Sequence, residues 1–168
     1  MSKRTQPQMT EFTFADTGIT VKVRKVSPMI ATDVAASFPE PEPPEQEVEY
    51  PGGKVMEKNY ADPNYIHAKA EYQKKVTMAL QRVMIQRAIK PTDEDWKEDV
   101  QEYREFIQQS TGKPLQEESD LLVYVMRVCI GSQEDMQDLL NAITKRSQAT
   151  PEAVEAARNS FRGQLQGS

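Results

Sequence analysis

A proline-rich segment at residues 39–44 is the feature that most limits how this chain can fold. Its sequence is Pro-Glu-Pro-Glu-Pro-Pro, and each proline removes a backbone N–H donor and fixes φ. The segment therefore ends the short helix that we expect over 28–38, in which Ser27 is the N-cap and Pro28 the first helical residue. Beyond that helix we expect a Pro/Gly-rich arm over 39–62.

Strand-like alternation precedes this segment. Residues 11–26 alternate apolar and polar side chains around a turn at 15–18, which places Ile19, Val21 and Val23 on one face. This pattern predicts an N-terminal β-hairpin with one face in solvent.

The arm carries a second strand–turn–strand pattern. Strand-like residues at 47–50 and 54–57 flank Pro51-Gly52-Gly53, and this combination predicts a hairpin. Prolines and acidic residues surround it. We therefore expect the hairpin to project from the rest of the molecule.

After Asp62-Pro63 the apolar residues recur with the period of a helix. We predict a mainly α (α+β) fold: a helical bundle of about five to six helices over 63–165, with the N-terminal β-hairpin and the projecting arm. We expect one domain over 11–166 after a disordered tail at 1–10. The predicted helices of the bundle cover 64–89, 92–111 opened by Thr92, a central buried 121–130, one that Ser132 caps and that carries Met136 to Ile143, and 150–165.

Charge and hydropathy limit the class of partner. The chain of 168 residues has a net charge of −5 and a pI near 5.1, whereas nucleic-acid binding needs a basic surface. Six Lys/Arg and one Glu lie in 65–90, but ten Asp/Glu and three Lys/Arg lie in 92–120, which favours adjoining helices that attract each other, or separate basic and acidic faces. No apolar run reaches membrane length and the first ten residues are polar, so we expect neither a membrane span nor a signal peptide.

Few side chains are suited to catalysis or metal binding. His67 is the only histidine and Cys129 the only cysteine; we expect a surface histidine and a buried, inert thiol in a reducing cytoplasm. Zinc sites use about four Cys/His ligands, the acidic residues at 93–99 lack the pattern of a calcium loop, and residues 51–54 lack that of a phosphate loop. We predict no enzyme activity and no catalytic, cofactor or metal site.

Aromatic residues gather in and beside the arm. Tyr50, Met56, Tyr60 and Tyr65 lie where little core is available to bury them, and exposed aromatic residues on arms often anchor partner chains. We predict these four as partner-binding residues. The alternative is that the arm folds back and buries them on its own bundle.

Several stretches spread over residues 11–162 form a recognisable set. They are Asp16–Pro28, the proline ladder with Val48–Lys54, Tyr60–Tyr65, Val128–Asp135 and Ile143–Gln148. Together they resemble the tail assembly chaperones of long-tailed (siphovirus-type) bacteriophages and prophages. The resemblance implies a non-virion helper in the host cytoplasm that coats the helical tape measure protein, keeps it soluble and is displaced as tail tube subunits polymerise. It carries over no catalytic or binding residue.

Two other functions fit the same residues. A structural virion component, such as a tail or head–tail adaptor protein, would use the hairpin arm for β-pairing between subunits. A small helical regulator that binds nucleic acid has its only support in the basic helix at 65–90. The expected partners are the tape measure protein, the tail tube protein and further copies of this chain, without nucleic acid or membrane.

Overall fold

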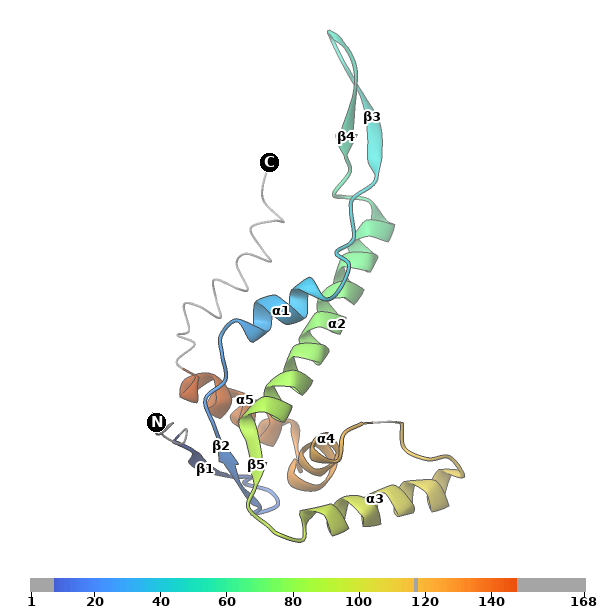
Figure 1. The fold of residues 1–168 in the computed structure, drawn as a ribbon. Helices are drawn as coiled ribbons and strands as arrows, with labels where there is room; N and C mark the ends of the chain where they lie inside the picture. Colours follow the sequence, from blue (N-terminus) through green and yellow to red (C-terminus); the bar gives the residue numbers. More distant parts are fainter. Residues whose placement is uncertain (1–7, 117, 148–168) are drawn as a thin grey trace, which may run out of the picture. The chain divides into compact units, whose positions relative to one another are not determined.

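The computed structural model describes residues 8–116 and 118–147 (Figure 1). Within these ranges the fold is α+β, with helices and two small antiparallel sheets. The described residues divide into two compact units: the first unit comprises 8–30 and 81–147, and the second unit comprises 31–80. The boundary falls inside one long helix. The helix predicted over 150–165 lies outside the described residues.

Pairs of strands and helices follow one another up to β5, and every later element of the described chain is helical. The elements are β1 (Thr10–Thr13), β2 (Thr20–Val23), α1 (Ile30–Ala36), β3 (Glu45–Tyr50), β4 (Gly53–Lys58), α2 (Pro63–Ala88), β5 (Ile89–Pro91), α3 (Trp96–Thr111), α4 (Asp120–Val123), the π-helix η1 (Tyr124–Cys129) and α5 (Gln133–Arg146).

The sheet of the first unit has three strands in the order β1-β2-β5. β1 and β2 pair antiparallel around a turn that is closed by two hydrogen bonds, from the Phe14 N–H to the Ile19 carbonyl and from the Gly18 N–H to the Phe14 carbonyl, both 2.9 Å. β5 then pairs with the other edge of β2. The expectation of a hairpin alone was therefore incomplete. β5 is three residues long, too short for an alternation pattern to reveal.

Arg24 fixes the point at which α2 ends. Its backbone N–H donates to the Ala88 carbonyl over 2.8 Å, and its guanidinium donates to the Arg87 carbonyl. The last carbonyls of a helix have no partner within the helix, and a cation favours the negative end of the helix dipole. The residue that follows β2 thus satisfies the end of α2, and the chain enters β5 directly.

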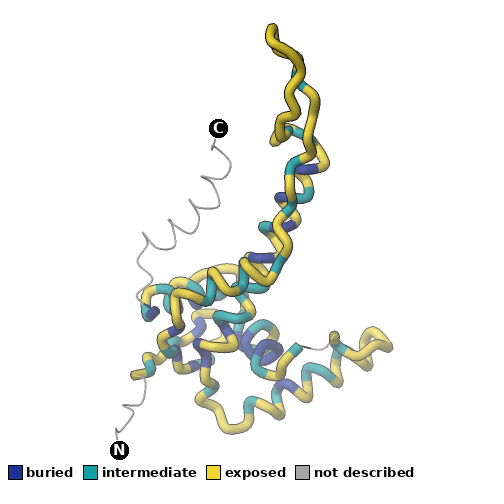
Figure 2. The backbone as a smooth tube through the Cα atoms, turned by 45° about the horizontal axis from the view of Figure 1, so that its top comes forward, coloured by how far each residue is buried: buried dark blue, intermediate teal, exposed yellow. Residues whose placement is uncertain are grey.

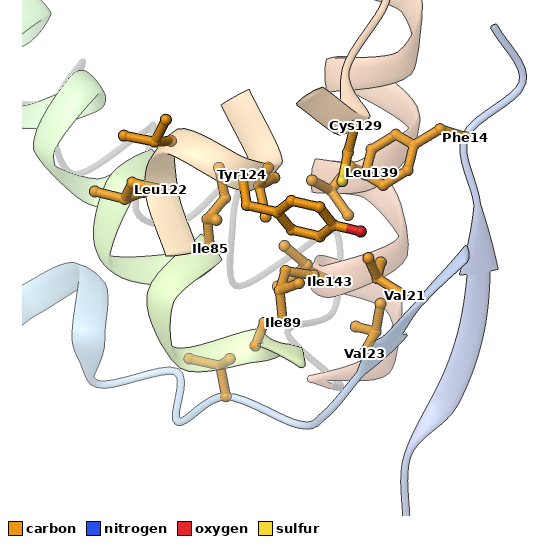
Figure 3. Packing of buried hydrophobic residues seen from close by; sticks show 14 of the residues in the cluster. Phe14, Val21, Val23, Ile85, Ile89, Leu122, Tyr124, Cys129, Leu139 and Ile143 are labelled. Atoms are coloured by element: carbon orange, nitrogen blue, oxygen red, sulfur yellow. The ribbon is translucent and has the colours of Figure 1, made fainter. Parts of the chain in front are cut away.

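Strands and helices share the hydrophobic core of the first unit (Figure 3). Tyr124 is the largest of its fully buried side chains, and its ring lies among Val21 of β2 and Leu139 and Ile143 of α5. The other buried members are Phe14, Val23, Val26, Ile85, Ala88, Ile89, Val100, Leu122, Val123, Val125 and Cys129.

The buried helix predicted over 121–130 is present but is not a regular α-helix. It begins as α4 and continues as η1, where the Ile130 N–H donates to the carbonyl of Val125, five residues earlier, over 3.1 Å. Tyr124, Val125 and Cys129 are all buried. The apolar run predicted the burial correctly. It could not predict the π-helical hydrogen bonding, because that depends on how the surrounding core fits.

The caps predicted at Ser132 and Thr92 had different outcomes. Ser132 caps α5 as predicted: its hydroxyl accepts from the Asp135 N–H over 3.1 Å. The cap at Thr92 was wrong, because α3 has its N-cap at Asp95. The Thr92 hydroxyl instead donates to the Thr20 carbonyl over 2.6 Å. The Thr92 side chain therefore bonds to β2 and does not cap α3.

The buried carboxylate of Asp135 joins two turns that are far apart in the sequence. One of its oxygens accepts from the Ala15 N–H over 3.1 Å and the other accepts from the Gly131 N–H over 3.0 Å. Thr17 adds a hydrogen bond from its hydroxyl to the Cys129 carbonyl over 2.7 Å. The approach is close: a Cβ at position 131 would lie 2.8 Å from the Asp16 Cβ. Only glycine fits there.

Replacing Asp135 with Asn should destabilise the first unit. The neutral amide keeps one acceptor but presents a donor to the second backbone N–H, which leaves a polar group unpaired. We expect the free energy of unfolding to fall by about 1–3 kcal/mol, measured by urea denaturation. Asp138→Asn on the exposed face of α5 is the matched control and should change it little. Equal effects of the two substitutions would contradict this role for Asp135.

The second unit is built on the N-terminal part of α2, which Asp62 caps by accepting the Tyr65 N–H over 2.9 Å. The buried residues Tyr65, Lys69, Tyr72 and Val76 follow one another at helical spacing and form a single stripe. The pattern predicted the apolar members of this stripe. It did not predict that a lysine would be buried between them.

Lys69 holds the proline-rich segment of the second unit. Its ammonium, in a residue only 6% exposed, forms an ion pair with Glu40 and lies 5.7 Å from the centre of the Tyr72 ring. Helix α1, shorter than the predicted 28–38, precedes this segment, and the Tyr72 hydroxyl donates to its Ala35 carbonyl over 3.5 Å. A buried cation needs a partner, and Glu40 supplies it.

Replacing Glu40 with Gln should loosen the second unit. The change leaves the Lys69 ammonium buried without a counter-charge, and we expect a loss of about 1–3 kcal/mol in local stability. Hydrogen exchange of the α2 backbone amides at 65–80 would measure it. Glu42→Gln, two residues away at an exposed position, is the control. Unchanged protection in Glu40→Gln would show that the ion pair does not hold this segment.

Candidate partner-binding surface

The hairpin formed by β3 and β4 is the most exposed structured part of the second unit. Every residue of β4 and all of β3 except the half-buried Val48 are exposed (Figure 2). The two strands pair with each other in register from Glu45 opposite Lys58 to Tyr50 opposite Gly53. They form a two-stranded sheet to which no other described strand is added. The predicted second hairpin is present, and its strands are longer than the sequence pattern indicated.

The alternation of side chains gives this hairpin two different faces. We call the first the apolar face, made of Gln46, Val48, Tyr50, Gly53, Val55 and Glu57. We call the second the charged face, made of Glu45, Glu47, Glu49, Lys54, Met56 and Lys58.

The apolar face is held in shape by one polar contact. The Tyr50 hydroxyl donates to the Glu57 carboxylate over 2.5 Å, diagonally across the strands. This hydrogen bond and the negative charge of Glu57 raise the pKa of Tyr50. Val48 and Val55 lie directly opposite each other beside this pair, and Val55 is 51% exposed. The face therefore exposes aromatic and β-branched side chains beside this hydrogen bond.

The charged face contains the one ion pair that the described hairpin forms. Lys54 and Glu47 lie 3.5 Å apart, and both side chains are more than half exposed. Such an exposed pair contributes little to stability. Met56 lies on this face, opposite Glu47.

The four residues predicted to bind a partner do not share one surface. Tyr50 and Met56 are exposed but lie on opposite faces of the hairpin. Tyr60, in the loop before α2, is 50% exposed, whereas Tyr65 is 8% exposed. The two rings form an edge-to-face contact with 6.0 Å between centroids. Tyr65 is therefore buried and packs against Tyr60, so it adds little to the exposed surface.

Val48 and Val55 were missed as candidates for this surface. The sequence already contained the signal, because strand alternation places both on the same side as Tyr50. A selection based mainly on aromatic side chains takes residues from both faces of the hairpin. Only the register showed which residues are neighbours.

The single histidine and the single cysteine lie in different environments. His67 is exposed on α2, and Cys129 is fully buried. Burial raises the pKa of the Cys129 thiol from 9.0 to about 12, so it is a poor nucleophile at neutral pH. Burial also raises the pKa of Tyr124. Among residues 8–116 and 118–147, no group of three or more His, Cys, Asp or Glu side chains is placed to hold a metal ion.

Within the described part of the chain, no helix has the length and apolar character needed to cross a membrane. Comparison with protein-family models, with curated proteins and with solved structures gave no match to this chain.

Because the Cys129 thiol is buried, the free energy of unfolding should decrease at alkaline pH. The folded chain keeps Cys129 protonated up to about pH 12, whereas the unfolded chain ionises near 9.0. The stabilisation that results is fully present below pH 9.0 and is lost as the pH rises toward 12. We expect the urea midpoint to fall more steeply across this window in the wild type than in Cys129→Ala, which has no thiol to ionise. Parallel curves would contradict the assignment.

Proposed function

We propose that this chain is a tail assembly chaperone of a long-tailed bacteriophage or prophage. In this role it binds the tape measure protein in the host cytoplasm, keeps it soluble, and leaves as tail tube subunits polymerise, so that it is absent from the mature virion. The sequence resemblance motivates the proposal. The observation that carries it is the apolar face of the β3–β4 hairpin, where Tyr50 and Val55 are exposed.

The client explains why such a surface would be retained. A tape measure protein is a long helix with extensive apolar surface, which aggregates when it is left exposed. Val48, Tyr50 and Val55 provide a compact contact for an apolar stripe of such a helix. The net charge of −5 on the chaperone helps to keep the complex soluble.

The size of the surface suits a helper that must be released. A contact through one hairpin face buries much less than the area of a stable protein–protein interface, about 1,200–2,000 Å². Each contact is therefore weak, and many copies along the client share the binding. In this proposal the hairpin makes the client contact. The chain acts by binding, without catalysis.

A structural component of the virion is the second candidate. Its specific support is the pair of open strand edges on the hairpin, which suit pairing between subunits of a particle. The two functions differ in where the protein ends up. Mass spectrometry of purified particles distinguishes them, because a chaperone is missing from the particle and a structural protein is retained.

Replacing both Val48 and Val55 with Thr should reduce binding of the tape measure protein. Threonine keeps the β-branched shape that favours a strand but replaces one methyl group of each valine with a polar hydroxyl. Burying a hydroxyl without a hydrogen-bond partner costs about 1–3 kcal/mol, so we expect at least about a tenfold drop in co-purified client. The measurement is co-expression followed by affinity capture.

Phe106→Thr is the matched control, because Phe106 is an apolar residue of α3 that is 60% exposed and lies outside the hairpin. It should leave capture unchanged. Deleting residues 40–60 should abolish capture. If the deletion leaves co-purification unchanged, the hairpin is not the client-binding surface and the proposal loses its main support.

A further inference from the structure

The outer edges of the β3–β4 hairpin carry backbone groups whose direction can be deduced. The Asn59 N–H donates to the Pro44 carbonyl over 2.7 Å, so these two residues form a hydrogen-bonded pair. In an antiparallel ladder such pairs alternate with pairs whose backbone groups point outward. Counting along the register from this pair, the outward groups belong to Glu45, Glu47 and Glu49 on β3 and to Lys54, Met56 and Lys58 on β4.

The same residues form the charged face, so the two open edges carry opposite charges. Three glutamates at alternate positions line the β3 edge, and two lysines that flank a methionine line the β4 edge. Both rows are exposed. Edge strands commonly carry charges that block pairing, but edges of opposite sign attract each other.

Charge determines which edges can meet. Two β3 edges would place glutamates against glutamates, and two β4 edges would place lysines against lysines; like charges directly opposite are destabilising. A β3 edge beside the β4 edge of another copy brings the two opposite charges together. One antiparallel register sets Glu45 opposite Lys58 and Glu49 opposite Lys54, which repeats the pairing inside the hairpin. Both members of each pair then have outward backbone groups available.

This edge-to-edge contact can be repeated from one copy of the chain to the next. Because β3 and β4 run antiparallel within a hairpin, a β3 edge and the β4 edge of the next copy are antiparallel when both hairpins point the same way. The contact is head-to-tail, so each copy keeps one edge free for another. The apolar faces of adjoining hairpins then form one continuous surface.

We infer that this hairpin is a self-association device, in which the acidic β3 edge of one copy pairs with the basic β4 edge of a second copy. An isolated two-stranded hairpin is only marginally stable in water, and strand addition supplies the neighbour that it lacks. The contact uses the strand edges and leaves the apolar faces open. It therefore does not depend on the proposed client.

A charge-exchange variant of the full chain tests the inference. The substitutions Glu45→Lys, Glu47→Lys, Glu49→Lys, Lys54→Glu and Lys58→Glu exchange the signs of the two edges but keep opposite charges paired inside each hairpin. Sedimentation velocity over a concentration series should show association of the wild type and of the variant alone. In mixtures, capture of untagged variant by tagged wild type should be at least tenfold weaker than capture of like by like.

A backbone variant provides the second measurement. Met56→Pro removes an outward N–H without breaking a bond inside the hairpin, because Met56 belongs to a pair that is not hydrogen-bonded internally. Met56→Thr keeps the N–H and is the matched control. Met56→Pro should sediment as a monomer, whereas Met56→Thr should associate like the wild type.

Three results would overturn the inference: a wild type that is monomeric at every concentration, mixed capture as strong as like-with-like capture, or association that survives Met56→Pro. Each is measured on the purified chain without a tape measure protein, so its outcome is separate from that of the client-capture experiment.

Discussion

The buried carboxylate of Asp135 is the interaction on which the arrangement of the first unit depends. It accepts from the backbone of the β1–β2 turn and from the turn between η1 and α5, and so closes a contact between residues 120 positions apart. Charge-assisted hydrogen bonds to a carboxylate are stronger than neutral ones, and their loss leaves buried donors unpaired. With the sheet held at this point, the core around Tyr124 fills the space between strands and helices.

In the second unit, polar contacts hold the segments on either side of the β3–β4 hairpin, and the hairpin itself stays exposed. Lys69 and Glu40 hold the proline-rich segment against α2, and Asp62 fixes the start of that helix. The hairpin between these anchors then exposes both faces and both edges. A folded chain that leaves Tyr50 and Val55 in solvent has a surface suited to another chain, and this links the fold to the proposed holding function.

Local signals predicted the elements that depend on local physics. The long helix α2, the Ser132 cap of α5 and the existence of the second hairpin all follow from capping residues, helical period and turn chemistry within a few positions. The errors occurred where a distant residue competes for the same atoms. Thr92 bonds to β2 instead of capping α3, and Arg24 ends α2 so that Ile89 enters a strand. The residues predicted to bind a partner were chosen by residue type, and the two that lie on the hairpin, Tyr50 and Met56, are on opposite faces.

By itself the sequence indicated the long helices and the two hairpins, and showed that chemistry-bearing side chains are few, because these follow from composition and short-range pattern. The tertiary structure alone decided which side chains are neighbours. It buried Lys69, turned an apolar run into a π-helix, and set the register that separates an apolar face from a charged one. The physical reason is that burial and strand pairing depend on contacts between residues far apart in the chain, and no local pattern encodes which of them will meet.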